Sequence, residues 1–150
     1  MNKTERILYR LGNLDRQIKE YGNEIKGLFA EKYSYMDHFL TTSTPEECNV
    51  GPGEDKESER KMLQQMMNAY DERIIRHTKH LKELRTEFDD IKWKVSNAGL
   101  TDVEHEYLRL RYFDRISVIL IADKLGYSER QTQRMRLSII RKIDEALLPG

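Results

Sequence analysis

Hydrophobic residues recur at alternating spacings of three and four in two long segments of the chain. The first series consists of Ile7, Leu11, Leu14, Ile18, Tyr21, Ile25, Leu28, Lys32, Tyr35 and Phe39. The second consists of Leu63, Met67, Tyr70, Ile74, His77, Leu81, Leu84, Phe88, Ile91 and Val95. Only Lys32 and His77 depart from the apolar character. This spacing is typical of helices that pack as a coiled coil, and each series spans about 48 Å of helix.

The segment between the two series, residues 41–58, contains two of the three prolines and two glycines, which indicates a connecting loop. Two helices of equal length joined by a loop are expected to fold back as an antiparallel hairpin. Ile7 would then lie opposite Val95, and Phe39 opposite Leu63. A parallel dimer of each helix is the alternative, but its loop would have to traverse the whole length of the helices.

Near the loop, both predicted helices carry further apolar residues outside the main series. These are Phe29, Tyr33, Met36 and Leu40 on the first helix, and Met62, Met66 and Ala69 on the second. A seam between two helices cannot bury both sets, so we expect the hairpin, residues 1–99, to form a homo-oligomer, in the simplest case a dimer. Alternatively, these residues wrap locally around the loop.

The spacing changes after Gly99, which suits the position just beyond a helix end. Thr101 and Glu104 then form a capping box, which predicts the start of a new helix. We therefore place a domain boundary near residue 99 and expect residues 100–150 to form a separate domain with its own three-helix core.

This second domain has the pattern of a helix-turn-helix. A helix is expected over residues 102–113, a compact one begins after Ser117, and a third runs from Ser128 to about residue 147, with Gly126 in the tight turn. The inner positions of the last two helices are Val118, Ile121, Ala122, Leu125, Thr132, Met135, Ile139, Ile143 and Ala146. The chain as a whole is therefore expected to be all-α: a long antiparallel coiled-coil hairpin followed by a three-helix helix-turn-helix domain.

Composition restricts the possible partners and compartments. The chain has 26 basic and 26 acidic residues, so it is not uniformly basic. One cysteine, Cys48, excludes an intrachain disulfide. The first residues carry charges without the apolar run of a signal peptide, and the longest apolar run, Val118–Ala122, is too short for a membrane span. We expect a cytoplasmic protein, of a bacterium or a phage-infected bacterial cell, without a membrane partner.

Basic residues concentrate locally on the last helix. Between positions 128 and 142 there are five basic residues and one acid, Glu129. Side chains with forked hydrogen-bonding groups at the start of such a helix can read base edges in the major groove of double-stranded DNA. The candidates for base reading are Glu129, Arg130, Gln131, Gln133 and Arg134, and those for phosphate contact are Arg115, Ser128, Arg136, Arg141 and Lys142.

Residues 100–147 resemble region 4 of bacterial sigma factors, the helix-turn-helix that reads the promoter −35 element. The matching pieces are Leu100-Thr101 with Glu104, Leu110-Arg111-Tyr112-Phe113, Ile121-Ala122, Leu125-Gly126-Tyr127-Ser128, Ile143 and Leu147. With the coiled-coil front, the chain resembles the ArpU and RinA groups of phage and prophage late transcription regulators. The resemblance implies sequence-specific DNA binding at a promoter. Glu129 departs from the basic residue common at this position.

Other functions are weighed against this hypothesis. A DNA-packaging accessory factor of the small terminase type also combines a helix-turn-helix with a coiled coil, and a protein module that docks on RNA polymerase is a further alternative. The glycines form no nucleotide-binding motif, and His77 with His80 lacks further metal ligands. We therefore expect no cofactor, no metal and no enzymatic activity.

Overall fold

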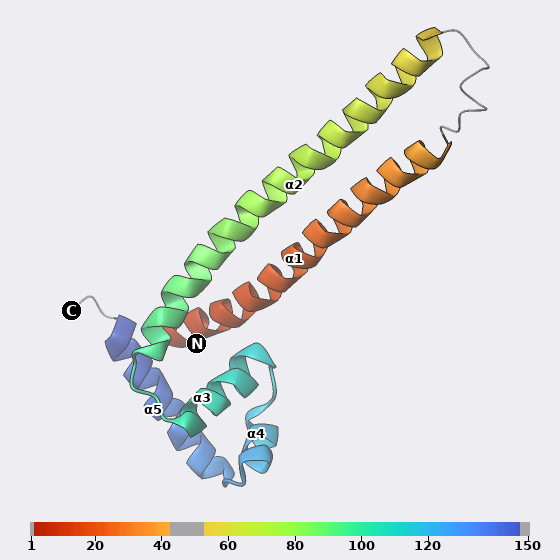
Figure 1. Ribbon diagram of the computed structural model, residues 1–150. Helices are drawn as coiled ribbons and strands as arrows, with labels where there is room; N and C mark the ends of the chain where they lie inside the picture. The colour runs from red at the N-terminus through yellow and green to blue at the C-terminus, as the bar shows by residue number, and fades with distance from the viewer. Residues whose placement is uncertain (1, 43–52, 148–150) are drawn as a thin grey trace. The chain divides into compact units, whose positions relative to one another are not determined.

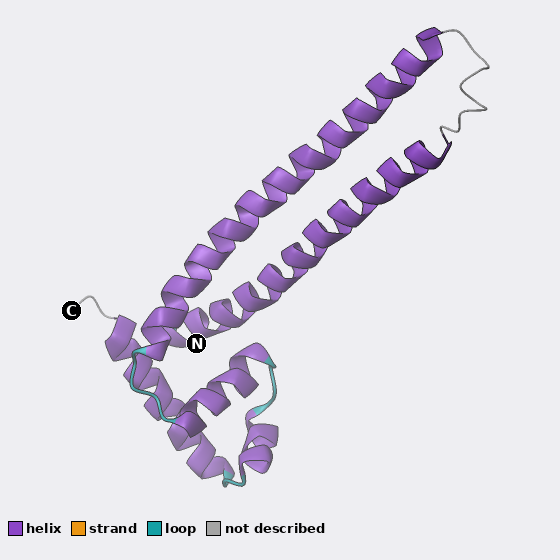
Figure 2. Cartoon of the chain, viewed as in Figure 1, coloured by secondary structure: helices purple, strands orange, loops and turns teal. Residues whose placement is uncertain are grey.

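The computed structural model describes residues 2–42 and 53–147, and all secondary structure within these ranges is helical (Figures 1 and 2). The elements are α1 (Lys3–Thr42), α2 (Gly53–Ser96), α3 (Asp102–Leu108), the π-helix η2 (Arg109–Phe113), α4 (Val118–Leu125) and α5 (Glu129–Leu147). The all-α class and the pair of long N-terminal helices are thus confirmed.

The loop expected over residues 41–58 is wrong at both ends, because α1 continues to Thr42 and α2 already begins at Gly53. Residues 54–61 are mostly glutamate, lysine and arginine, which have high helix propensity and extend α2 toward the loop. Cys48 lies outside the described residues.

The chain forms two compact units, which differ from the two expected domains. One unit combines Met1–Ile18 with Glu83–Gly150, and the other is Lys19–Lys82. The boundary predicted near residue 99 therefore lies inside the first unit. We call the first the head unit and the second the hairpin unit, and describe each by itself.

In the hairpin unit, the segments of α1 and α2 run antiparallel. Lys32 Nζ lies 2.6 Å from Asp71 Oδ1, and the rings of Tyr35 and Tyr70 lie 6.3 Å apart. These pairs match the expected register to within a few residues. The ion pair also explains how a lysine is accommodated in the seam. The most deeply buried apolar side chains of this unit are Leu28, Ile74 and Leu81.

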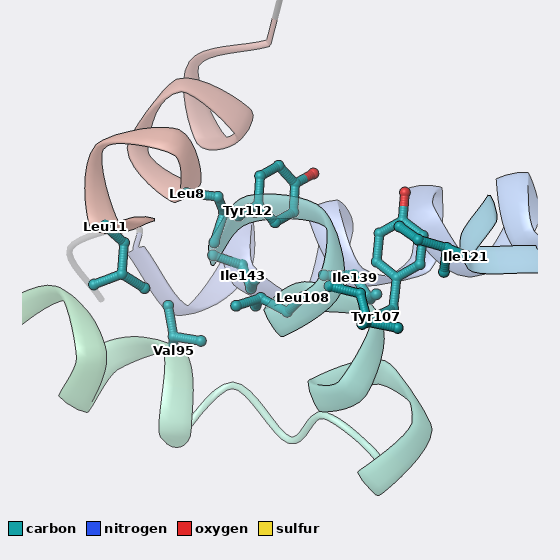
Figure 3. Close-up of a cluster of buried hydrophobic side chains, with 10 residues drawn as sticks. Leu8, Leu11, Val95, Tyr107, Leu108, Tyr112, Ile121, Ile139 and Ile143 are labelled. Carbon is teal, nitrogen blue, oxygen red and sulfur yellow. The ribbon is translucent and has the colours of Figure 1, made fainter. Parts of the chain in front are cut away.

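The head unit has one hydrophobic core, to which all its helices contribute (Figure 3). Its fully or nearly fully buried members are Leu8, Leu11, Val95, Tyr107, Leu108, Leu110, Tyr112, Ile121, Ile139 and Ile143. Leu8 and Leu11 come from α1 and Val95 from α2. The core of the helix-turn-helix is therefore completed by the first turns of α1 and the last turn of α2, and is not formed by residues 100–150 alone.

A glycine allows α1 to approach the rest of the head unit closely. A Cβ atom at Gly12 would lie 2.0 Å from the carbonyl oxygen of Tyr112 and 2.9 Å from its carbonyl carbon. No real Cβ atom tolerates such a contact with backbone. Glycine is therefore required at this position of α1 for η2 to lie against it.

The helix expected over residues 102–113 is present, but its geometry changes at Arg109. Its second part is the π-helix η2, in which the Asp114 amide donates to the Arg109 carbonyl over 3.0 Å. The Arg109 guanidinium also bonds to the carboxylates of Glu106 and Asp114, the latter over 3.1 Å. The two bonds to Asp114 join the first residue of η2 to the residue that follows it. At the start of α3, the capping box of Thr101 and Glu104 is present as expected.

Candidate nucleic-acid interface

Helices α4 and α5 form the predicted helix-turn-helix. The Ser117 hydroxyl accepts from the Leu120 amide over 3.4 Å and caps α4. Gly126 ends α4 in the left-handed conformation with φ 72°, and the Tyr127 amide donates to the Ala122 carbonyl over 3.0 Å. The turn reverses the chain within three residues because glycine adopts positive φ without steric cost. Helix α4 then packs on α5.

The start of α5 is fixed by a reciprocal cap. Ser128 Oγ accepts from the Gln131 amide over 3.1 Å, and Gln131 Oε1 accepts from the Ser128 amide over 3.0 Å. The Ser128 carbonyl also accepts from the Thr132 hydroxyl over 2.9 Å. Two residues assigned to DNA contact therefore also stabilise the helix end, and only the amide nitrogen of the Gln131 side chain is left to meet a base.

The two faces of α5 differ as the pattern predicted. Thr132, Ile139 and Ile143 are fully buried. The opposite face is exposed and carries all five residues that were predicted to read bases: Glu129, Arg130, Gln131, Gln133 and Arg134. Within residues 2–42 and 53–147, the side chains of Arg130, Arg134 and Arg141 make no hydrogen bond or ion pair. Three guanidinium groups on this face are therefore available to an anionic partner.

Arg136, a predicted phosphate contact, is instead bound to a buried carboxylate. Its Nε and Nη2 lie 3.1 and 2.9 Å from the two carboxylate oxygens of Glu5, which also accepts from the Tyr112 hydroxyl over 3.1 Å. Burial alone would raise the pKa of Glu5, but the hydrogen bonds and charge of Arg136, helped by Tyr112 and Arg111, lower it below its usual value. This group of side chains ties α5 to α1 and η2.

Lys142 is engaged in the same way. Its Nζ lies 2.6 Å from Glu104 Oε1, and the same carboxylate oxygen accepts from the Thr101 amide over 3.0 Å. Burial would raise the pKa of Glu104, but Lys142 and the capping box lower it. Glu5 and Glu104 are each buried, so Arg136 and Lys142 neutralise charges inside the head unit. Their charges are therefore compensated within the head unit, and their contact with DNA phosphate stays a prediction.

Arg115 lies at the entrance to α4, two residues before its cap. It is exposed and has a backbone φ of 56°, a conformation that residues other than glycine and asparagine rarely adopt. Its guanidinium donates to the side-chain oxygen of Asn13 on α1. The same region contains three arginines that sequence reasoning missed, namely Arg6, Arg10 and Arg111, which line an open cleft of about 460 Å³ together with Arg115. The spacing of four between Arg6 and Arg10 was the available signal, because it places both on one face of α1.

Comparison with known proteins found no match among family models, curated proteins or solved structures. No helix within the described ranges is both long and apolar enough to cross a bilayer. The same residues contain no group of three or more histidine, cysteine, aspartate or glutamate side chains placed to hold a metal ion.

Proposed function

We propose that this protein is a sequence-specific DNA-binding transcription regulator that places α5 in the major groove. The observation that carries the proposal is the exposed face at the capped start of α5, where Arg130, Gln133 and Arg134 have no partner among the described residues. In helix-turn-helix proteins the second helix enters the major groove and its N-terminal residues contact base edges. The resemblance of residues 100–147 to sigma factor region 4 supports the same assignment.

The chemistry of the exposed residues suits base recognition. The guanidinium groups of Arg130 and Arg134 can donate two hydrogen bonds to guanine, and the amide of Gln133 can pair with adenine. Glu129 can accept a hydrogen bond from the amino group of cytosine. Arg141, farther along the exposed face, is the phosphate contact on α5. This combination predicts a target sequence that contains both G·C and A·T base pairs.

The internal ion pairs give α5 a fixed position. Glu5 and Glu104 bind Arg136 and Lys142 from elements outside the helix-turn-helix, so α5 is anchored at two points along its length. Base reading by bidentate hydrogen bonds requires that the helix is held in one position, because misplaced donors lose most of their selectivity for the correct base. The first turns of α1 and of α3 therefore contribute to DNA reading by positioning α5.

The hairpin unit is proposed to form a homodimer. Tyr33 and Met62 are 58% and 62% exposed, and Phe29 and Met36 are also exposed, whereas Met66 is half-buried. The side chain of Leu40 lies outside the described residues. Large apolar side chains exposed together mark association surfaces. A dimer would carry two copies of α5 and gain affinity by binding two half-sites at once.

In vitro selection tests the proposal. The full chain is used to enrich duplexes from a randomised library, and bound sequences are mapped by footprinting. We expect a defined motif to be enriched and protected. The control is the Arg130→Ala/Arg134→Ala variant, which keeps the buried face and the Ser128–Gln131 cap of α5 and should not enrich the motif. Failure of the wild-type chain to enrich any sequence would refute sequence-specific binding.

A second candidate function is supported by a separate observation on α4. Ile119 and Leu120 are 65% and 56% exposed, and Leu137 on α5 is 61% exposed. Exposed apolar residues on a helix-turn-helix can dock on another protein, such as RNA polymerase. An Ile119→Ser/Leu120→Ser variant would then keep full DNA affinity but lose promoter activation in a reconstituted transcription assay. Loss of DNA affinity in this variant would argue against a separate docking role.

A further inference from the structure

Four arginines line the open cleft of the head unit. Its walls come from α1, from η2 and from the turn before α4, and its lining residues are Arg6, Tyr9, Arg10, Asn13, Arg111 and Arg115. None of these described lining residues is acidic. All six residues belong to one compact unit, so the cleft depends on the folded head and not on a single helix.

The guanidinium groups of this cleft are only partly neutralised. Arg10 is paired with Glu87 through two hydrogen bonds of 3.0 Å. Glu5 lies close enough to Arg111 for the two charges to interact, but it forms its ion pair with Arg136. No carboxylate within the described ranges forms an ion pair with Arg6, Arg111 or Arg115. The cleft therefore has a net positive charge, which favours an anionic ligand.

The arginines on one side of the cleft are held in place by neutral partners. Arg111 Nη1 donates to the Ile116 carbonyl over 3.1 Å, and its guanidinium carbon lies 6.0 Å from the Tyr9 ring centroid. Its Nε is buried without a hydrogen-bond partner in the described part of the chain, an unsatisfied donor of the kind that accompanies functional sites. Arg115 is held by Asn13. Neutral partners fix these groups without cancelling their charge, which is the arrangement that recognition of phosphate oxygens needs.

We propose that this cleft binds a backbone phosphate of double-stranded DNA, so that DNA contact extends from α4 and α5 onto the start of α1. This inference rests on the proposed function. In helix-turn-helix docking, the first helix crosses the sugar–phosphate backbone while the second enters the groove. Arg115 lies two residues before the cap of α4, so a strand that passes the start of α4 also passes the mouth of the cleft. Arg6 on α1 would then meet the same strand.

The test compares charge-removing variants in the full-length chain. Arg6→Gln and Arg115→Gln are made singly and together, because neither side chain has an ion pair within residues 2–42 and 53–147. Arg76→Gln is the matched control, since it removes the same charge from an exposed arginine of the hairpin unit that has no ion pair in the described part of the chain. Circular dichroism and thermal unfolding check that every variant is folded. Affinity is measured for a selected duplex and a random duplex over a series of salt concentrations.

We expect both cleft variants to weaken binding to the two duplexes by the same factor, because phosphate contacts carry no sequence information. The slope of log K against log salt should fall by about 0.9 for each phosphate that the variant no longer neutralises. Arg6→Lys should retain most of this slope, because it keeps the positive charge. Arg76→Gln should behave as the wild type. A slope that falls equally in Arg76→Gln and in the cleft variants would indicate a general charge effect and overturn the site.

Further outcomes distinguish a wrong cleft assignment from a wrong DNA-binding function. They also distinguish a DNA phosphate from free phosphate as the ligand of the cleft. If the cleft variants bind both duplexes as the wild type does, while Arg134→Ala loses selectivity, the DNA-binding function stands and the cleft assignment falls. If no variant binds DNA and neither does the wild type, both fall together. Calorimetric titration with inorganic phosphate forms the last arm. Heat of binding that disappears in Arg6→Gln/Arg115→Gln, with DNA affinity unchanged, would assign the cleft to free phosphate and overturn the DNA contact.

Discussion

Replacing Gly12 with alanine should destabilise the protein, although alanine is the better helix former. The added Cβ would lie 2.0 Å from the Tyr112 carbonyl oxygen, whereas ordinary contacts of this kind begin near 3.4 Å. The α1 and η2 backbones would therefore have to separate by about 1.4 Å, in a core where side chains are already close-packed. Overpacking of this kind costs about 1–3 kcal/mol, and the obstacle is backbone, which cannot change rotamer.

Two other glycines of α1 provide the control. A Cβ atom at Gly22 or at Gly27 would meet nothing within 4 Å, so alanine at either site should stabilise the helix by about 0.5–1 kcal/mol. Urea unfolding followed by circular dichroism measures all three variants. We expect Gly12→Ala to lower the free energy of unfolding by about 1–3 kcal/mol and the other two to raise it. A Gly12→Ala variant that is stabilised like Gly22→Ala would show that α1 does not lie against η2.

Three further predictions follow from the ion pairs, the shared core and the hairpin. Because the pKa of Glu5 is lowered by folding, its ionised form stabilises the fold above its unfolded pKa of about 4.5, and this contribution is lost as pH falls through the folded pKa. Glu5→Gln should thus lower stability near neutral pH and flatten the acid side of a thermal-unfolding profile, whereas an unchanged profile would refute the ion pair with Arg136. A fragment of residues 100–150 should lack cooperative thermal unfolding because α1 and α2 complete its core, and a sharp transition would contradict the shared core. Tyr33→Lys/Met62→Lys should convert the proposed dimer to a monomer in light scattering, and a monomeric wild type would remove the dimer hypothesis.

Periodicity was sufficient to predict the helices because each has a repeated apolar face. The seam positions from Leu63 to Val95 are all buried or half-buried, and the glycine at position 126 and the caps at Ser117 and Ser128 lie where local chemistry required them. The π-helix could not be predicted, because the apolar spacing of residues 109–113 does not distinguish it from an α-helix.

The division of the chain could not be predicted for a different reason. Ile7 fitted the seam pattern, but the neighbouring Leu8 is the fully buried residue. The reason is that the start of α1 packs against residues 100–147 as well as against α2. Gly12 did not reveal this contact either, because Gly22 and Gly27 lie in the same helix and approach nothing. Helical periodicity reports which face is buried but not which distant element buries it.

The candidate site shows the same limit. The exposed face of α5 followed from its spacing, so Arg130, Gln133 and Arg134 lie where they were expected. The engagement of Arg136 with Glu5 joins residues that are 131 positions apart, and no pattern in one sequence reports such a pairing. Counting basic residues along the chain therefore overstated the uncompensated positive charge of α5.

The most direct test of DNA reading by α5 compares Arg134→Ala with Arg141→Ala on a selected and a random duplex. Arg134 is proposed to contact a base, so its loss should reduce the ratio of specific to random affinity roughly 5- to 150-fold. This corresponds to a loss of about 1–3 kcal/mol in the binding free energy that separates the two duplexes. Arg141 is proposed to contact phosphate, so its loss should weaken both duplexes alike and lower the salt slope by about 0.9. Equal losses on both duplexes for Arg134→Ala would contradict the placement of α5 in the major groove.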